Sequence, residues 1–463
     1  MPEAVIQSNA IDLESLAADV VAQAMKAGAS DAEAVVREGD EFSVTVRMGE
    51  VEKLQESGSR GLGVRVFLGK RSASTSTSDL TAEGVRQAVR GAVALARITE
   101  EDPFSGLAEA GEFGSAPGDL HLYFEDVYSL PGPERIAWAR RCEAAALAAD
   151  PRITNSNGGS FDVSTGRKVL ANSRGFLGSY RSSYAGGSTA PLAKDENGQM
   201  QRDFWYSSAR RIGDLDSPES VGVEAARRTL RRLGAKRVPT QKVPIVFAQE
   251  TARSLIGSVF EAASGDSVWR SASFLAGKLG ESIAASSLTL IDDNTMLLPN
   301  GVGGYGSSPF DGEGLPSCTT VVVEKGILRS YLLNTYTARK LGMKSTHTAA
   351  RGLAGAPGIG AGNLYLEPGT LTPDQIIGAI PAGLFVTGLM GFGTNLVTGD
   401  YSRGATGLWI ENGQLTHAVE EVTIAGNLAE MLRNVSAIGN DLVFRGSITS
   451  PTLRIDGMTI AGA

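Results

Sequence analysis

The sequence predicts an α+β fold, with an N-terminal unit of antiparallel sheet and helices followed by a C-terminal strand-rich, glycine-rich domain. Two observations carry this prediction. Apolar residues alternate with period two in some segments and repeat with helical period in others, and the two kinds of segment do not form a βαβ alternation. The 57 glycines crowd the C-terminal half, which favours many turns and short strands over long helices.

Residues 1–100 are expected to form the N-terminal α+β unit. Apolar residues repeat at helical spacing over residues 13–25, after Asp12 as a cap, and Gly28 ends this helix. Residues 32–77 change to period two and turn at Gly69-Lys70, which predicts a meander of short antiparallel strands. A second helix, over roughly residues 81–98, closes the unit.

Residues 101–240 are expected to form a central region of linker, helices and long strands that packs with the N-terminal unit. Residues 99–132 are rich in Gly, Pro and acidic groups, which is typical of a linker. A helix with Pro in its first turn is predicted over residues 133–148, and a second helix with a basic face over 218–233. Between them, the alternation over residues 153–208 predicts long strands.

Residues 241–463 are expected to form the C-terminal strand-rich domain. It begins with a short buried strand at 243–247 and a helix at 248–263, and further helices are expected at 336–341 and 428–437. The uncharged stretch 376–399 is longer than a bilayer span requires. Its Pro381 and many glycines favour a buried strand pair over a membrane helix.

The charge and cysteine content exclude several kinds of partner and suggest a compartment. A net charge of −8, from 43 basic and 51 acidic residues, gives no electrostatic reason to bind nucleic acid or an anionic membrane. Cys142 and Cys318 are the only cysteines, which fits a reducing cytoplasm. Residues 1–4 show no basic region followed by an apolar core, so we expect no signal peptide.

Histidine is scarce, which limits metal chemistry. The chain has only His121, His347 and His417, and none lies in the strand-helix segment 244–266. Catalytic zinc needs neutral imidazole or thiolate ligands at fixed spacing, with an open position for water. We therefore expect no zinc site in this segment, no metal ligands and no cofactor in this chain.

Two acidic residues, Asp311 and Glu313, lie in the sequence Phe-Asp-Gly-Glu-Gly before a predicted hairpin. Paired acids could perform acid/base chemistry or bind a cation. The favoured interpretation is a turn in which the two carboxylates accept hydrogen bonds from nearby backbone N–H groups.

A second polar cluster, Asp400, Tyr401, Ser402 and Arg403, lies between Gly399 and Gly404 in an apolar half of the chain. Loops of this kind often line clefts. The pattern is close to a nucleophile elbow, but Asp400 stands where the first glycine belongs and no base is evident for Ser402. Asp311, Glu313 and these four residues are therefore candidates for lining a substrate channel, and no catalytic residue is assigned.

Ordered strings along nearly the whole chain resemble the TldD/TldE (PmbA) metallopeptidase family. TldD-like members carry HExxxH on the helix before a Gly-Asp pair and a cysteine near the C-terminus. Counting back from Gly265, the two histidine positions fall at Ile256 and Glu261 and the glutamate position at Gly257, and residues 444–447 hold no cysteine. The chain is thus similar to the TldE/PmbA branch. The matching strings are RGLGVRV (60–66), STS (74–76), SGD (264–266), SFLAGKLG (273–280), LIDD (290–293), FDGEG (310–314), NTYTA (334–338), TGDYSRGA (398–405), NG (412–413), GNL (426–428) and GNDL (439–442).

The resemblance implies a subunit without zinc that assembles with a TldD-type subunit, or with itself, in a homo- or heterodimer. Zinc would be carried by the TldD-type partner, and the pair would form a cytoplasmic peptidase for unfolded or modified peptides. Extended peptides bind to exposed sheet edges by strand addition, which a strand-rich domain offers. Two alternatives stay open: a stand-alone metal-independent hydrolase centred on Ser402 or on Asp311 and Glu313, and a non-catalytic regulator or scaffold.

Overall fold

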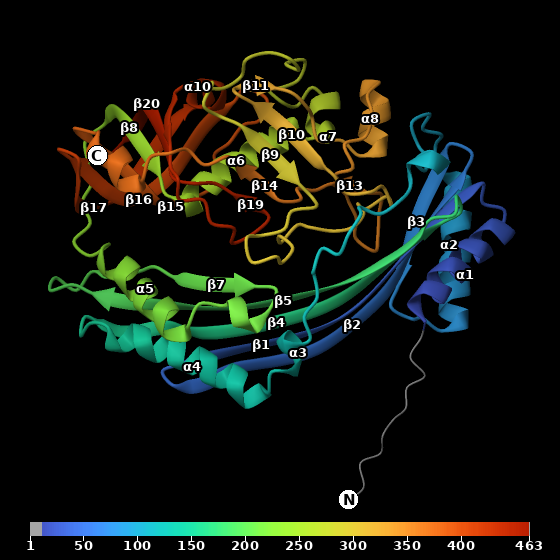
Figure 1. The fold of residues 1–463 in the computed structure, drawn as a ribbon, viewed down its shortest axis with the longest axis horizontal. Coiled ribbons are helices and arrows are strands. Elements are labelled where there is room, and N and C mark those ends of the chain that lie inside the picture. The colour runs from blue at the N-terminus through green and yellow to red at the C-terminus, as the bar shows by residue number, and fades with distance from the viewer. Residues whose placement is uncertain (1–11, 463) are drawn as a thin grey trace, which may run out of the picture.

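A computed structural model describes residues 12–462 of the chain. A long curved sheet lies beneath a C-terminal unit of shorter strands, and helices lie against the outer face of the sheet (Figure 1). The predicted α+β class is confirmed, because the sheets are antiparallel or mixed and the helices do not alternate with parallel strands. The expectation that there is no signal peptide concerns residues 1–4, which lie outside the described residues.

The curved sheet has seven strands in the order β3-β2-β1-β4-β5-β6, with β7 also paired to β5. Strands from the first hundred residues and from the central region therefore share one sheet, joined where β1 pairs with β4. The first strands are far longer than the short strands expected from the sequence. The strands are β1 (Asp31–Arg47), β2 (Glu50–Leu68), β3 (Arg71–Thr77), β4 (Ile153–Asn172), β5 (Leu177–Lys194), β6 (Met200–Arg202) and β7 (Trp205–Ala209).

Helices cover both ends of the outer face of this sheet. At one end, α1 (Leu13–Lys26) and α2 (Ala82–Ile98) bury the apolar face of β1 and β2, and each begins at a side-chain cap, Asp12 or Thr81. At the other end lie α4 (Gly132–Ala148) and α5 (Pro218–Leu230). The short helices η1 (Ala110–Glu112), α3 (Asp126–Ser129) and η2 (Ile212–Asp214) lie in the connections.

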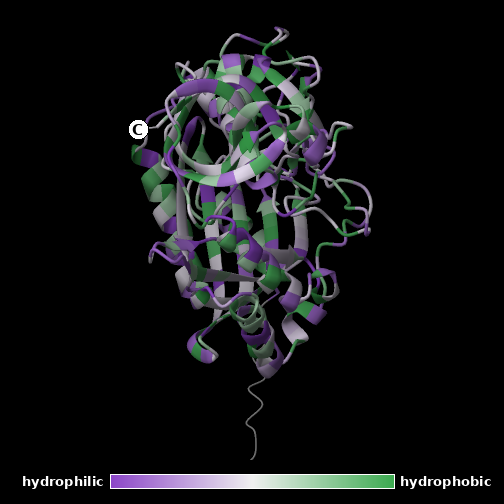
Figure 2. Ribbon diagram, turned by 90° about the vertical axis from the view of Figure 1, so that its left-hand side faces the viewer, coloured by the Kyte–Doolittle hydropathy of each residue, from purple (hydrophilic) through white to green (hydrophobic). Residues whose placement is uncertain are grey.

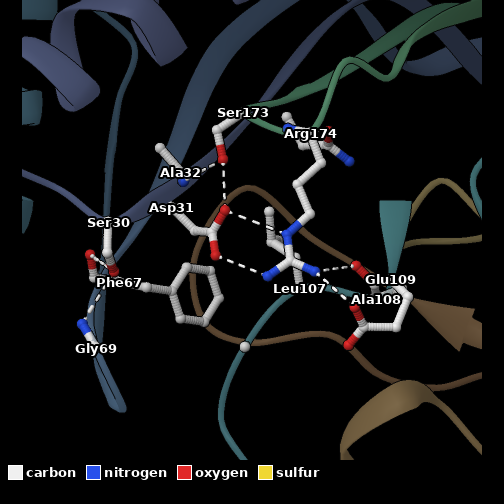
Figure 3. A network of polar contacts seen from close by, with 12 residues as sticks. Ser30, Asp31, Ala32, Phe67, Gly69, Leu107, Ala108, Glu109, Ser173 and Arg174 are labelled. Atoms are coloured by element: carbon white, nitrogen blue, oxygen red, sulfur yellow. Dashed lines mark hydrogen bonds and ion pairs between the residues drawn. The ribbon is translucent and has the colours of Figure 1, made fainter. Parts of the chain in front are cut away.

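The segment 99–132 connects the sheet to the C-terminal unit. On the sheet side, Arg174 places Nη2 2.9 Å from Asp31 Oδ2 and donates through Nη1 to the Ala108 carbonyl at 2.8 Å (Figure 3). On the other side, Arg339 of α8 (Thr335–Leu341) donates to the carbonyls of Gly106 and Leu107, at 3.0 and 2.6 Å. These charge-assisted bonds hold the segment at several points.

The C-terminal unit is built on a six-stranded sheet in the order β17-β16-β15-β8-β20-β18. An additional pairing of β17 with β20 closes five of these strands into a barrel, seen end-on as a ring in Figure 2. The strands are β8 (Gln241–Phe247), β15 (Ala382–Met390), β16 (Asp400–Glu411), β17 (Gln414–Asn427), β18 (Val435–Ile438) and β20 (Leu453–Ala461).

Helix α6 (Gln249–Ala263) follows β8 directly, as the sequence predicts, and buries Leu255, Ile256 and Val259 in the main core of the unit. A second sheet in the order β11-β10-β9-β14-β19 belongs to the same unit. The remaining elements are α7 (Gly265–Trp269), β9 (Leu290–Asp293), β10 (Thr319–Glu324), β11 (Ile327–Leu328), β12 (Ala349–Ala350), β13 (Gly358–Ile359), β14 (Leu364–Leu366), α9 (Pro373–Gly378), α10 (Leu428–Arg433) and β19 (Ile448–Thr449).

Two expectations for this unit differ from the structure. The helix expected over 428–437 ends at Arg433, because Val435 and Ile438 pair with β20 as strand β18. The uncharged stretch 376–399 is not a buried strand pair. It holds the end of α9, the strand β15 and a turn on which Phe392 and Val397 are exposed. No helix within residues 12–462 is long and apolar enough to cross a membrane.

Candidate functional site

A cleft of about 650 Å³ lies along the solvent-facing side of α6. The helix contributes residues spaced as one face of an α-helix, opposite to its buried apolar stripe. The facing wall comes from the turn between β15 and β16, from β16 itself, and from the segment before β19. The lining residues are Arg253, Ser254, Gly257, Ser258, Glu261, Phe392, Thr394, Arg403, Gly446, Ser447 and Ile448.

The positions singled out by the family resemblance meet at this cleft. Gly257, Glu261 and the pair Gly446-Ser447 all line it. Ile256 does not, because its side chain is 1% exposed and packs in the core. Residues five apart on a regular helix of 3.6 residues per turn point about 140° apart. On this helix, positions 256 and 261 therefore do not face the same side.

The residues present do not fit a zinc ion. Glu261 is the only one of the positions 256, 257, 261 and 444–447 that carries a zinc-binding side chain, and a zinc site needs three or four such ligands. Within residues 12–462, no group of three or more His, Cys, Asp or Glu side chains is arranged to hold a metal ion.

Two guanidinium groups line the cleft without a carboxylate partner. Arg403 Nη1 lies 3.3 Å from Ser254 Oγ, and its Nε is buried with no hydrogen-bond partner in the described part of the chain. Arg253 Nη1 lies 3.3 Å from the hydroxyl of Tyr206 on β7. The backbone carbonyl of Tyr206 accepts a bond from Arg445 at 3.4 Å, and Tyr206, Arg445 and Arg253 line a neighbouring pocket that shares Arg253 with the cleft.

The polar cluster 400–403 lies at the start of strand β16 and not in the loop that its flanking glycines suggested. Of its four residues, only Arg403 lines the cleft. Tyr401 is 2% exposed in the core, where burial raises the pKa of its hydroxyl to about 12, and so it cannot form a cleft wall. Asp400 is exposed and accepts a bond from Thr398 Oγ1 at 2.6 Å.

Ser402 has no base beside it. Its side chain is exposed, and its hydroxyl makes no hydrogen bond to any residue between 12 and 462. His347 Nδ1 lies 2.7 Å from the Pro316 carbonyl oxygen, and a hydrogen bond with the Cys318 thiol raises the pKa of its imidazole. His417 contacts its neighbour Thr416. The structure therefore brings no histidine to Ser402.

Asp311 and Glu313 are buried away from the cleft. Asp311 accepts bonds from the backbone N–H groups of Glu313 and Leu315, at 2.8 and 3.0 Å, and Glu313 accepts from the Thr335 N–H at 2.9 Å. Burial raises the pKa of both carboxyl groups, and the charge of Asp311 adds to the shift of Glu313. Asp311 therefore closes its own turn, whereas Glu313 accepts bonds from the distant Thr335 at the start of α8, and both carboxylates are buried.

Sequence reasoning did not identify most residues of the cleft. Arg253, Ser254, Ser258 and Phe392 line the cleft and carry no motif. The available signal was the polar face of the predicted helix at 248–263, opposite its apolar stripe.

The fold and the cleft define a class of α+β protein in which a barrel faces a long curved sheet and the first helix of the barrel unit carries a polar cleft. Three family descriptions match the sequence: PmbA/TldA metallopeptidase domain 1 at residues 32–96, the central domain at 125–233 and the C-terminal domain at 240–462. The chain belongs to the PmbA/TldD metallopeptidase family.

Two curated relatives match along nearly their whole length. Metalloprotease PmbA of Escherichia coli O157:H7 is 40% identical over 95% of this chain and 94% of its own length. The Metalloprotease PmbA homolog of Haemophilus influenzae is 36% identical over 99% and 98%.

Solved structures share the fold. A putative modulator of DNA gyrase from Bacteroides thetaiotaomicron superposes with a TM-score of 0.89 at 29% identity, covering 97% of this chain and 99% of that one. TldE from Thermococcus kodakarensis has a TM-score of 0.86 at 22% identity, covering 96% and 100%, and at that identity the likeness concerns the fold alone.

Proposed function

We propose that this chain is a TldE/PmbA-like subunit of a cytoplasmic peptidase that degrades or processes unfolded or modified peptides, and that a TldD-type partner carries the zinc. One observation carries the proposal. The cleft on α6 contains three of the places where TldD-like sequences hold HExxxH and a cysteine, and here they are occupied by Gly257, Glu261 and the pair Gly446-Ser447, while the first histidine position, Ile256, is buried in the core. Such a cleft can hold a peptide but lacks the set of ligands that would hold a water-activating zinc ion.

An open sheet edge supports assembly with a partner. The half of β2 from residue 50 to 61 pairs only with β1, because β3 pairs with β2 from Leu62 onward. Residues 50–60 are exposed on both faces of the strand, including Val51 and Leu54. A long exposed edge is a template for another strand, and soluble proteins usually cover or protect it. A partner subunit seated here would extend the sheet.

The test is co-expression of this chain with a TldD-type subunit that carries HExxxH. We expect the two to copurify, to hold about one zinc per pair, and to cleave unfolded peptides only together and only without chelator. Metal analysis of this chain alone should find no tightly held zinc. Chelator-resistant cleavage by this chain alone would refute the proposal in favour of a stand-alone hydrolase. A stable pair without any cleavage would point to a regulator or scaffold.

A further inference from the structure

Charge is unevenly distributed along the cleft. Arg253 lies near the first turn of α6, and Arg403 reaches Ser254 from β16, so two positive groups lie at one end. Glu261 lies eight residues further along the helix, which is about 12 Å at 1.5 Å per residue. The cleft is therefore positive at one end and negative at the other.

The positive end has unused hydrogen-bonding capacity. A guanidinium carries five N–H donors. Arg403 uses one of them in a long 3.3 Å contact to a serine hydroxyl, and its buried Nε has no partner among the described residues. The Nη2 group of Arg403 also has no hydrogen-bond partner among the described residues and, unlike Nε, is not buried, so a planar carboxylate in the cleft can bind at this end of the guanidinium.

The middle of the cleft is small and polar. Gly257 and Ser258 form the helix side, and a Cβ added at Gly257 would approach only Ile448 Cδ1, at 4.0 Å. A backbone can therefore pass close to the helix between the two charged ends. The ring of Phe392 is fully exposed at the rim and can cover an apolar side chain of a bound ligand.

We propose that the cleft binds short peptides with free ends, holding the α-carboxylate at Arg403 and Arg253 and the α-ammonium at Glu261. A span of about 12 Å corresponds to about four residues in extended conformation, at 3.3–3.6 Å each. The ligand class is thus a tri- to pentapeptide or the product end of a longer chain. This inference rests on the proposed function, because it assumes that the natural ligand of the cleft is a peptide.

The test compares tetra-alanine with its C-terminal amide, by calorimetric titration of the purified chain. We expect the free acid to bind about 10-fold or more tightly than the amide, since a charge-assisted bond contributes about 1.5–3 kcal/mol. N-acetylation should weaken binding by a smaller factor, because Glu261 is exposed and screened. Arg403→Ala should remove the preference for the acid, and Arg403→Lys should restore part of it.

Two further variants keep the test decisive. Gly257→Met should block the cleft and abolish binding while the helix stays folded, because methionine is a better helix former than glycine. Arg433→Ala, at the exposed end of α10, is the matched control and should leave binding unchanged. Equal binding of acid and amide, or no binding at peptide concentrations up to about 10 mM, would overturn the inference.

The outcome is separable from that of the proposed function. If the two-subunit complex cleaves peptides but the chain alone shows no preference for a free carboxylate, the inference fails and the proposed function stands. If the preference is found but no zinc-dependent cleavage appears with a TldD-type subunit, the proposed function fails and the binding site stands.

Discussion

Arg351 Nη1 lies 2.7 Å from Glu33 Oε1, and both side chains are buried where the C-terminal unit meets the curved sheet. Arg65 Nη1 lies 3.3 Å from the same carboxylate oxygen, from the neighbouring strand β2. The guanidinium of Arg37 adds a bond to the Arg351 carbonyl. The Glu33 carboxylate on β1 thus pairs both with Arg65 of its own sheet and with Arg351 in a loop of the C-terminal unit, and this couples the two units electrostatically.

Removing Glu33 should destabilise the protein strongly. Glu33→Ala leaves Arg351 buried without its counter-charge, and breaking a buried pair on one side costs about 3–5 kcal/mol. The double variant Glu33→Leu with Arg351→Met should recover part of this loss, because Arg351 is then no longer a buried charge and only Arg65 has lost its carboxylate partner. Urea unfolding measures both, with Glu83→Ala as control, because the Glu83–Arg86 pair is exposed and its loss should cost less than about 1 kcal/mol. Equal losses of stability in Glu33→Ala and Glu83→Ala would contradict the coupling of the two units through Glu33.

Asp292 should make stability fall as pH rises. Burial raises the pKa of this carboxyl to about 7, and Asp292 Oδ2 has no hydrogen-bond partner among the described residues. In the unfolded chain this carboxyl has a pKa near 3.8, so its stabilising contribution is fully present below about pH 4. That contribution is lost as the pH rises from about 4 to about 7, the folded-state pKa. The full difference corresponds to at most about 4 kcal/mol.

Asp292→Asn should therefore flatten the pH dependence between about pH 4 and 7 and raise the urea midpoint at pH 8. Glu100→Gln is the matched control, because Glu100 is exposed and should leave both unchanged. If the stability of Asp292→Asn falls with rising pH as steeply as that of the unchanged protein, a group other than Asp292 causes the pH dependence.

The sequence indicates local structure well in this protein and long-range pairing poorly. Apolar residues that repeat with a period of 3.6 residues predict α1, α2 and α6, because each helix buries a continuous apolar face. The pairing of β1 with β4 and the closure of the barrel through β17 and β20 join distant segments, and no local pattern encodes them. Strand β2 is longer than its apolar alternation because its first half is exposed on both faces.

The polar cluster at 400–403 shows how glycine can mislead. Of the two flanking glycines, Gly399 does lie at a turn, with a φ of 81°, but Gly404 lies inside β16 opposite Met390 of β15. Further along the same strand, a Cβ added at Gly407 would be 2.0 Å from the Phe385 carbonyl oxygen. Glycine is needed there because neighbouring strands approach closely, not because the chain turns. Alternation along the strand then sends Tyr401 into the core, on the face opposite Asp400 and Ser402 and the same face as Arg403.

Charging the open edge of β2 should abolish subunit assembly. Val51→Lys with Leu54→Lys places two more cations on an exposed strand, which is how natural edges resist pairing, and we expect at least about 10-fold weaker association. The fold should persist, because both side chains are exposed. Light scattering and copurification with the TldD-type subunit measure the effect. Leu415→Lys on β17 is the control, and loss of assembly in this variant as well would argue against β2 as the interface.

Arg403 and Ser402 should differ sharply in the assembled peptidase, although they are neighbours on β16. Arg403 lines the cleft with an unpartnered Nε, so Arg403→Ala should raise KM for peptides by about 10- to 100-fold, the loss of a charge-assisted bond. Ser402 has neither a base nor a place in the cleft, so Ser402→Ala should change turnover less than about 2-fold.

Tyr401→Phe should leave turnover unchanged and keep or increase stability, because it removes a buried hydroxyl without a partner. Peptide cleavage by Arg403→Ala, Ser402→Ala and Tyr401→Phe, each measured with and without the partner and with and without chelator, checks the three predictions. Cleavage that resists chelator and is lost on Ser402→Ala would establish a serine hydrolase instead. Unfolding of Arg403→Ala, seen by circular dichroism, would show that this arginine is structural, and the role assigned to it in the cleft would then be wrong.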